Sequence, residues 1–97
     1  MAKRTPEELE LAVKEWNRSQ LKVSMRQARL ALYNQGLLES VDTQIATLDE
    51  PARTLAGIEW RHSDTIERVS PLVATVGAAL NLSDEQLDTL FELAATL

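Results

Sequence analysis

Three adjacent residues, His62, Ser63 and Asp64, are of the types that form a base, a nucleophile and an orienting carboxylate. Consecutive residues on a helix point about 100° apart, so these three cannot form the linear hydrogen-bonded chain that a catalytic triad requires. Glu59 and Glu67 lie near His62 in the sequence. A single imidazole among carboxylates is a poor site for a transition metal. We therefore expect neither a triad nor a metal centre here.

The other residues with chemical potential also lack the spacing that chemistry needs. Asp84, Glu85 and Asp88 form an acidic group, but a calcium loop needs alternating acids around a central glycine. The positive end of a helix dipole explains acids at such a position without a ligand. The three glycines are too scattered for a phosphate-binding loop, and there is no cysteine. We expect a non-enzymatic protein with no catalytic residues, no cofactor and no metal.

Helix start signals recur along the chain and indicate which elements position these residues. Thr5 with Glu8, Ser24 with Gln27 and Ser83 with Gln86 each have the spacing of a capping box. Helix stop signals are Gly36, after which Leu37 can fold back on Leu32, and Asn81 in the left-handed conformation. These signals predict helices that begin near residues 6, 25 and 84 and end near residues 35 and 80.

Apolar residues recur at three- and four-residue steps between these signals, as in amphipathic helices. The expected inward residues of the middle helices are Leu38, Val41, Ile45 and Leu48, then Leu55, Ile58, His62, Ile66 and Val69. The helix that opens at Pro51 is expected to reach Arg68 or Val69, although residues 61–64 are polar and could break it. A fifth helix is expected after Ser70-Pro71. No segment alternates with period two over the length of a strand.

The predicted fold class is all-α, a compact bundle of five to six short helices with an amphipathic N-terminal helix. Residues 1–22 are expected to form this helix as an arm or docking helix, and residues 23–97 to form the compact helical domain. A chain of 97 residues corresponds to one domain. No apolar run approaches the roughly 20 residues that cross a bilayer, and the N-terminus lacks the apolar stretch of a signal peptide.

Charge is unevenly distributed along the chain. Residues 1–36 hold seven basic and four acidic side chains, and residues 37–97 hold three basic and eleven acidic ones, for a total of −5. The basic residues Lys14, Arg18, Lys22, Arg26 and Arg29 would form one stripe if residues 6–35 were a single helix. Such a stripe is either a contact for an acidic surface or a solvated outer face. The negative net charge disfavours nucleic acid as the partner.

A heptad pattern in the same stretch raises a second hypothesis. Leu9, Trp16, Val23 and Leu30 are seven residues apart, as in one position of a coiled coil. The alternatives are a helix that packs on its own domain and a helix that packs on a different partner.

Trp60 lies off the face that carries Leu55 and Ile58. It either packs in the core or anchors an interface beside Arg61. The residues that we expect to bind a partner are Leu9, Val13, Trp16, Arg18, Lys22 and Trp60.

About three quarters of the chain carries motifs in a characteristic order. They are Ser24-Met25-Arg26-Gln27-Ala28-Arg29-Leu30-Ala31-Leu32, Gly36-Leu37-Leu38 with Val41 and Ile45, Ile58-Glu59-Trp60, Pro71-Leu72-Val73, and the run from Ala79 to Phe91. From Val23 to Leu97 the chain resembles small helical proteins, or C-terminal segments, encoded in the tail and tail-fibre modules of tailed bacteriophages and prophages. The resemblance implies a role near the tail tip, baseplate or fibres without enzymatic activity.

The main functional hypothesis is a structural or interaction protein that docks to a tail, baseplate or fibre protein, or to copies of itself. The alternative is a tail-fibre assembly chaperone that is absent from the mature virion. A third interpretation, a nucleic-acid-binding regulator, depends on the basic stripe. We expect no membrane partner, and a location in the virion tail or in the host cytoplasm during assembly.

Overall fold

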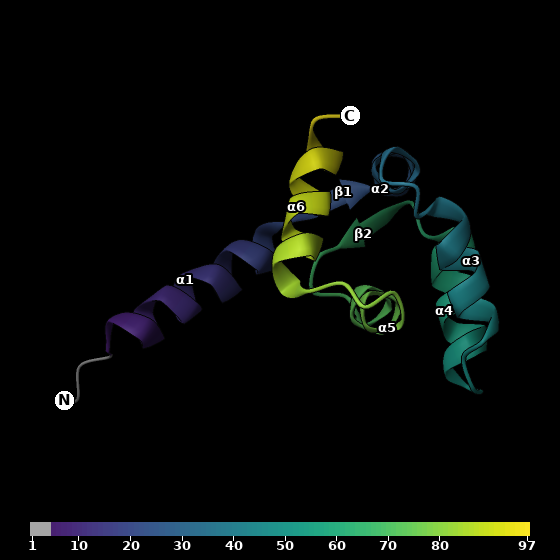
Figure 1. The fold of residues 1–97 in the computed structure, drawn as a ribbon, viewed down its shortest axis with the longest axis horizontal. Coiled ribbons are helices and arrows are strands. Elements are labelled where there is room, and N and C mark those ends of the chain that lie inside the picture. The colour runs from purple at the N-terminus through teal and green to yellow at the C-terminus, as the bar shows by residue number, and fades with distance from the viewer. Residues whose placement is uncertain (1–4) are drawn as a thin grey trace.

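The computed structural model describes residues 5–97, which form six α-helices and two short strands (Figure 1). The elements are α1 (Pro6–Gln20), β1 (Lys22–Ser24), α2 (Met25–Asn34), α3 (Leu38–Ala46), α4 (Ala52–His62), β2 (Thr65–Glu67), α5 (Pro71–Ala79) and α6 (Asp84–Ala95). The predicted fold class, a mostly helical bundle with an amphipathic N-terminal helix, is confirmed.

The predicted helix starts are confirmed by their hydrogen bonds. In each of the three capping boxes the cap hydroxyl accepts from the third backbone N–H, and the third side chain accepts from the cap N–H. At Ser24, for example, these donor–acceptor distances are 3.0 and 2.9 Å. These bonds satisfy N–H groups that the first helical turn leaves without partners.

The predicted helix ends are also confirmed. Gly36 and Asn81 both have positive φ, at 72° and 57°. The left-handed residue turns the chain back, so that the N–H of Leu37 donates to the carbonyl of Leu32 at 2.8 Å. The N–H of Leu82 reaches the carbonyl of Gly77 at 2.9 Å in the same way. Both ends have the geometry of a Schellman motif.

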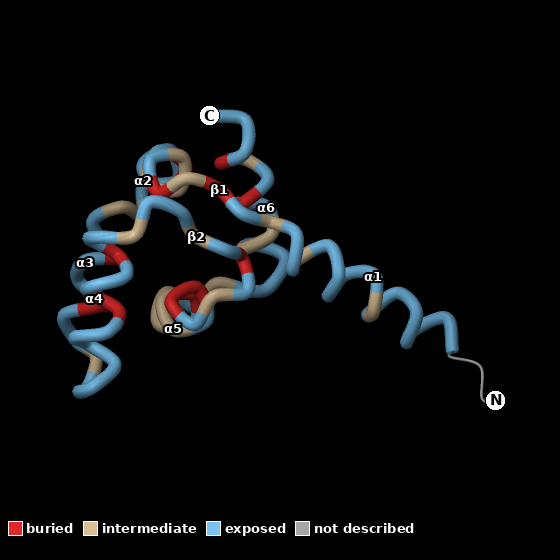
Figure 2. Tube along the Cα trace, turned by 180° about the vertical axis from the view of Figure 1, so that it is seen from behind, coloured by how far each residue is buried: buried red, intermediate tan, exposed pale blue. Residues whose placement is uncertain are grey.

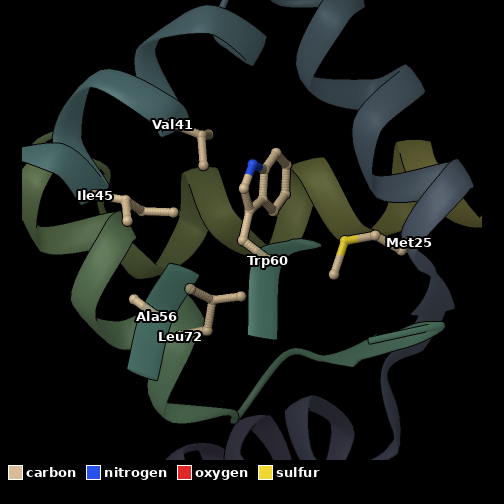
Figure 3. Packing of buried hydrophobic residues seen from close by; sticks show 6 residues of the cluster. All are labelled: Met25, Val41, Ile45, Ala56, Trp60 and Leu72. Carbon is tan, nitrogen blue, oxygen red and sulfur yellow. The ribbon is translucent and has the colours of Figure 1, made fainter. Parts of the chain in front are cut away.

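Two adjoining hydrophobic clusters form the core of residues 21–97. In the first, Trp60 of α4 lies between Val41 and Ile45 of α3 on one side and Met25 of α2 on the other (Figure 3). The indole N–H of Trp60 donates to Asp42 Oδ1 at 3.0 Å, so the only polar atom of the side chain is satisfied. The second cluster surrounds Phe91 and Ala94 of α6 and includes Val23, Ala31 and Val73.

The two short strands were not predicted from the sequence, which indicated helices joined by short turns. β1 and β2 pair antiparallel, with Val23 opposite Ile66. The ladder continues beyond them through Arg68 N–H to the Leu21 carbonyl at 2.9 Å and Met25 N–H to the Asp64 carbonyl at 2.7 Å. Three residues are too few for a period-two pattern to stand out, so this pairing left no local signal. It also separates α1 from α2 and ends α4 at His62 rather than at Arg68 or Val69.

The orientation of α4 differs from the prediction. Ala56, Gly57 and Trp60 are buried, whereas Leu55 and Ile58 are 59% and 51% exposed. Ala56 and Gly57 are small, and a Cβ on Gly57 would meet only the side chain of Arg61 of the same helix, at 3.1 Å. Trp60 is the large side chain on this side of α4. The stripe that contains Leu55, Ile58 and His62 faces outward, because Trp60, which packs in the core cluster, lies on the opposite side of the helix.

The helix α1 projects from one end of the molecule, and α3 and α4 lie at the other end (Figure 1). The described part of the chain extends 48 × 32 × 22 Å. Among residues 5–97, every buried residue lies in the body after α1 (Figure 2). The shape is therefore a packed body with an exposed helical arm.

Candidate protein-docking surface

The arm presents an apolar face, defined by Leu9, Val13 and Trp16, that its own body does not cover. The three side chains are 51%, 57% and 64% exposed. Their i, i+4, i+7 spacing places them on one side of the helix. This is the pattern of anchors with which an amphipathic helix occupies a groove in a partner. An exposed tryptophan within such a pattern is a typical interface anchor.

A network of charged groups anchors the last turn of α1 to α6. Arg18 donates from Nε to both carboxylate oxygens of Asp88, at 3.0 and 3.1 Å, and its Nη2 lies 3.0 Å from Oδ2. Arg68, just after β2, donates from Nε to the same carboxylate at 2.9 Å and from Nη2 to Asp84 Oδ1 at 3.1 Å. Asp88 thus joins α1, α6 and the chain after β2, and fixes the direction in which the arm leaves the body.

The electrostatics of this network favour its charged form. Burial acts to raise the pKa of Asp88, but the hydrogen bonds and positive charges of Arg18 and Arg68 outweigh it and hold the pKa below its ordinary value. The hydrogen bond to Asp88 likewise raises the pKa of Arg18. Arg68 has a side chain only 7% exposed, so its positive charge depends on these two aspartates for compensation.

The six residues expected to bind a partner are found in different environments. Leu9, Val13 and Trp16 are exposed on α1, and Lys22 is exposed on β1 opposite Glu67. The structure does not place Arg18 and Trp60 on a free surface. Arg18 is occupied by Asp88, and Trp60 is only 3% exposed. The interpretation of Trp60 as core packing is therefore the correct one of the two.

The patterns that required one helix over residues 6–35 do not form. Leu21 has extended backbone and β1 follows it, so the basic stripe and the heptad repeat are both interrupted. Val23 of the heptad is buried in the core. Arg29 of the stripe lies over the indole of Trp60, 4.2 Å from the ring centroid, and donates to the Trp60 carbonyl. Both hypotheses are wrong in the form that used a continuous helix.

Sequence reasoning missed two features of the surface and its support. One is the second exposed apolar patch, Leu55 and Ile58 on α4, which was assigned to the core. The other is the link from Asp88 to Arg18 and Arg68, residues 70 and 20 positions away. The adjacent small residues Ala56 and Gly57 are a signal that could have identified the buried side of α4. Nothing local indicates the Asp88 network.

An apolar cavity of about 70 Å³ lies between the two core clusters. Residues from α2, α5 and α6, including Ala28, Val76 and Leu90, contribute to its lining, together with Trp60 of α4 and Ile66 of β2. Its lining is formed by apolar side chains, so it offers no group for acid–base or nucleophilic chemistry.

The residues around His62 do not assemble a reactive group. Ser63 donates from its hydroxyl to Glu59 Oε2 at 2.8 Å, and His62 is exposed. Among residues 5–97, no three histidine or acidic side chains gather closely enough to hold a metal ion. In the same part of the chain, no helix combines the length and apolarity needed to span a bilayer.

Comparison with known proteins gives no relative from which a function could be transferred. No protein-family model, curated protein or solved structure matches the chain at a significant level. The functional argument therefore depends on the exposed face of α1 and the network that holds it.

Proposed function

We propose that this chain is a non-enzymatic interaction protein of a bacteriophage tail, in which α1 docks to a tail, baseplate or fibre protein. The observation that carries the docking function is the apolar face of α1, whose Leu9, Val13 and Trp16 are each more than half exposed. Full burial of a large apolar side chain contributes about 1.5–3 kcal/mol, and a partner that covers the exposed half of each of these side chains can gain about half of that. The assignment to a phage tail is supported by the resemblance of residues 23–97.

A protein partner is favoured over a lipid surface by the charges of α1. Its polar side carries Glu7, Glu8, Glu10 and Glu15, whereas the basic residues of the helix are Lys14 and Arg18. Arg18 is already paired with Asp88. Helices that lie on anionic membranes present lysine and arginine instead. The acidic polar side of α1 suits a protein groove with a basic rim.

The anchored base of the arm also supports docking. A helix held at its last turn by Arg18 and Asp88 loses less freedom on binding than a loose tail would. Pre-organisation of this kind raises affinity by lowering the entropic cost of association.

The docking function is tested by affinity capture with the purified chain and tail proteins of the phage or prophage that encodes it. We expect a tail, baseplate or fibre protein to bind the wild type and the control Tyr33→Glu, which changes an exposed aromatic residue of α2. Trp16→Glu should lower this binding at least tenfold. Equal binding by Trp16→Glu and the wild type would refute docking through α1.

Mass spectrometry of purified virions separates a structural component from an assembly chaperone. A stoichiometric amount of the chain in virions supports the structural role. Its presence in assembly intermediates but absence from virions supports the chaperone.

A further inference from the structure

We propose that the apolar face of α1 docks on the exposed face of α4 in a second copy of this chain, so that copies associate head to tail. This inference rests on the proposed function of α1 as a docking helix and names one partner for it. The acceptor face is defined by Leu55, Ile58 and His62.

The acceptor face consists of side chains of one helix of the body that the rest of the molecule leaves exposed. Leu55 and Ile58 are 59% and 51% exposed, and His62 is exposed one turn further along α4. These positions are separated by three and four residues, which places them on one side of the helix.

The spacings of the two faces match in antiparallel orientation. On α1 the residues 9, 13 and 16 are separated by four and three positions, and on α4 the residues 62, 58 and 55 are separated by four and three positions in reverse order. Antiparallel packing therefore sets Val13 opposite Ile58 and Trp16 opposite Leu55. Leu9 then lies against His62, whose imidazole ring offers an apolar body and a polar tip.

The charges beside the two faces also favour the antiparallel orientation. Glu8 and Glu15 lie along one edge of the apolar face of α1, and Arg61 lies along one edge of the α4 face. Among the described residues, neither Glu15 nor Arg61 takes part in an ion pair within the chain. Antiparallel packing brings these edges together, with opposite charges adjacent.

The opposite edges are compatible with this orientation. Glu59 lies on the other edge of the α4 face and accepts from the Ser63 hydroxyl. In antiparallel packing it meets the edge of α1 that carries Glu10 and the neutral Asn17. In parallel packing it would instead meet Glu8 and Glu15, and Arg61 would lose those partners. Antiparallel packing therefore has one repulsive pair, Glu59 with Glu10, and keeps Arg61 beside Glu8 and Glu15. Parallel packing would place Glu59 beside two glutamates and leave Arg61 without them.

The two faces cannot meet within one molecule. The arm α1 and helix α4 lie at opposite ends of the longest dimension, 48 Å (Figures 1 and 2). Because donor and acceptor are different surfaces, the contact between copies is heterologous, and its repetition gives either a ring or an open chain. One helix against another is a small interface, so we expect a dissociation constant of roughly 10–100 µM.

The test uses two single variants of the full chain that disable opposite ends. Trp16→Glu removes the donor face and Ile58→Glu removes the acceptor face, and both residues are exposed, so the fold is retained. In sedimentation velocity up to about 1 mM, the wild type and the control Tyr33→Glu should form oligomers beyond a dimer. Each variant alone should self-associate at least tenfold more weakly than the wild type, with a dissociation constant of roughly 0.1–1 mM or above.

Mixing the two variants is the decisive measurement. The intact α1 of Ile58→Glu should bind the intact α4 of Trp16→Glu and form a 1:1 complex that grows no further. Trp16 fluorescence should shift to shorter wavelength on mixing, because its indole leaves water while Trp60 is already buried in both variants.

The proposal is overturned if the mixture stays monomeric, or if the wild type is monomeric over this concentration range. Self-association of Ile58→Glu equal to that of the wild type would overturn it in favour of α1 pairing with α1. The proposed function would still stand after either result if the wild type captured a tail protein and Trp16→Glu did not. If the wild type captured no tail protein but the two variants still formed the 1:1 complex, the proposed function would fail and the head-to-tail association would stand.

Discussion

Asp88 is the residue on which the attachment of the arm depends most. Its carboxylate accepts from Arg18 and from Arg68, and Arg68 is nearly buried. Removing the acceptor charge leaves the Arg68 guanidinium with only the solvent-exposed Asp84 as a partner. A buried charge without compensation is costly, so the effect of losing Asp88 should exceed that of losing Asp84.

We predict that Asp88→Asn lowers the free energy of unfolding by about 2–4 kcal/mol. The matched control Asp84→Asn should cost less than about 1 kcal/mol, because the Asp84 side chain is 67% exposed. Urea denaturation with unchanged m-values measures both. Equal losses in the two variants would contradict the special role of Asp88.

The lowered pKa of Asp88 predicts a specific acid sensitivity. Because the pKa is lower in the folded than in the unfolded chain, the unfolded chain binds the proton first as the pH falls. The stabilisation is complete above about pH 5 and is lost progressively as the pH falls through about 4 toward the folded pKa. Urea denaturation from pH 7 to pH 3 should show a shallower acid loss in Asp88→Asn than in the wild type.

Glu50 gives an internal comparison for this pH series. The hydrogen bond from the Thr54 hydroxyl, followed by that from Arg53, outweighs its burial and lowers its pKa. Glu50 is on the exposed turn before α4, so Glu50→Gln should flatten the acid loss less than Asp88→Asn does. The opposite ranking would show that the arm network is not the main source of acid sensitivity.

At the scale of elements, α1 is a helix whose formation and placement have separate causes. Its capping box at Thr5 and Glu8 and the first-turn proline act locally. Its direction depends on the Arg18–Asp88 pair and on the Arg68 N–H that donates to the Leu21 carbonyl. Removing only the ion pair should therefore loosen the arm while the helix and the body remain folded.

We predict that Arg18→Ala makes α1 move more freely on the ps–ns timescale. Backbone order parameters of residues 6–17 should fall from about 0.85 toward 0.6, while those of α6 stay near 0.85. Lys14→Ala, on the exposed part of the same helix, is the control and should change neither. Unchanged order parameters in Arg18→Ala would mean that the backbone link at Leu21 alone holds the arm.

At the scale of the whole molecule, the body is packed around a small apolar cavity. A cavity of about 70 Å³ corresponds to about 1.7 kcal/mol of forgone stability at 24 cal/mol per Å³. Two clusters built mostly from Leu, Val, Ile and Ala meet there, with Phe91 and Trp60 as the large side chains. Added volume at this place should therefore stabilise the fold.

We predict that Val76→Ile, which adds one methylene to a residue lining the cavity, raises the free energy of unfolding by about 0.5–1 kcal/mol. Val69→Ile adds the same group at a position that is 54% exposed, and should change stability by less than about 0.5 kcal/mol. Thermal and urea unfolding of both variants measure the difference. A destabilised Val76→Ile would show that the cavity is too narrow for the added group.

The sequence by itself determined where most helices begin and end, because those boundaries are formed by hydrogen bonds between residues three to five positions apart. The boxes at Ser24 and Ser83 and the left-handed residues Gly36 and Asn81 were predicted from local patterns. The same reasoning named Leu9, Val13 and Trp16 as candidate partner contacts, and all three are exposed in the structure. Their spacing along one helix can be recognised from the residues of that helix alone, without knowledge of its neighbours.

Only the tertiary structure decided which side of α4 is buried, where the strands pair and what holds the arm. Leu55 and Ile58 form as regular a stripe as the true core residues, and the exposed side was decided by how Trp60 fits against α2 and α3. The β1–β2 pairing and the Asp88 network join residues far apart in sequence. These contacts stabilise the protein only after folding has brought the distant residues together, so no local sequence pattern predicts them.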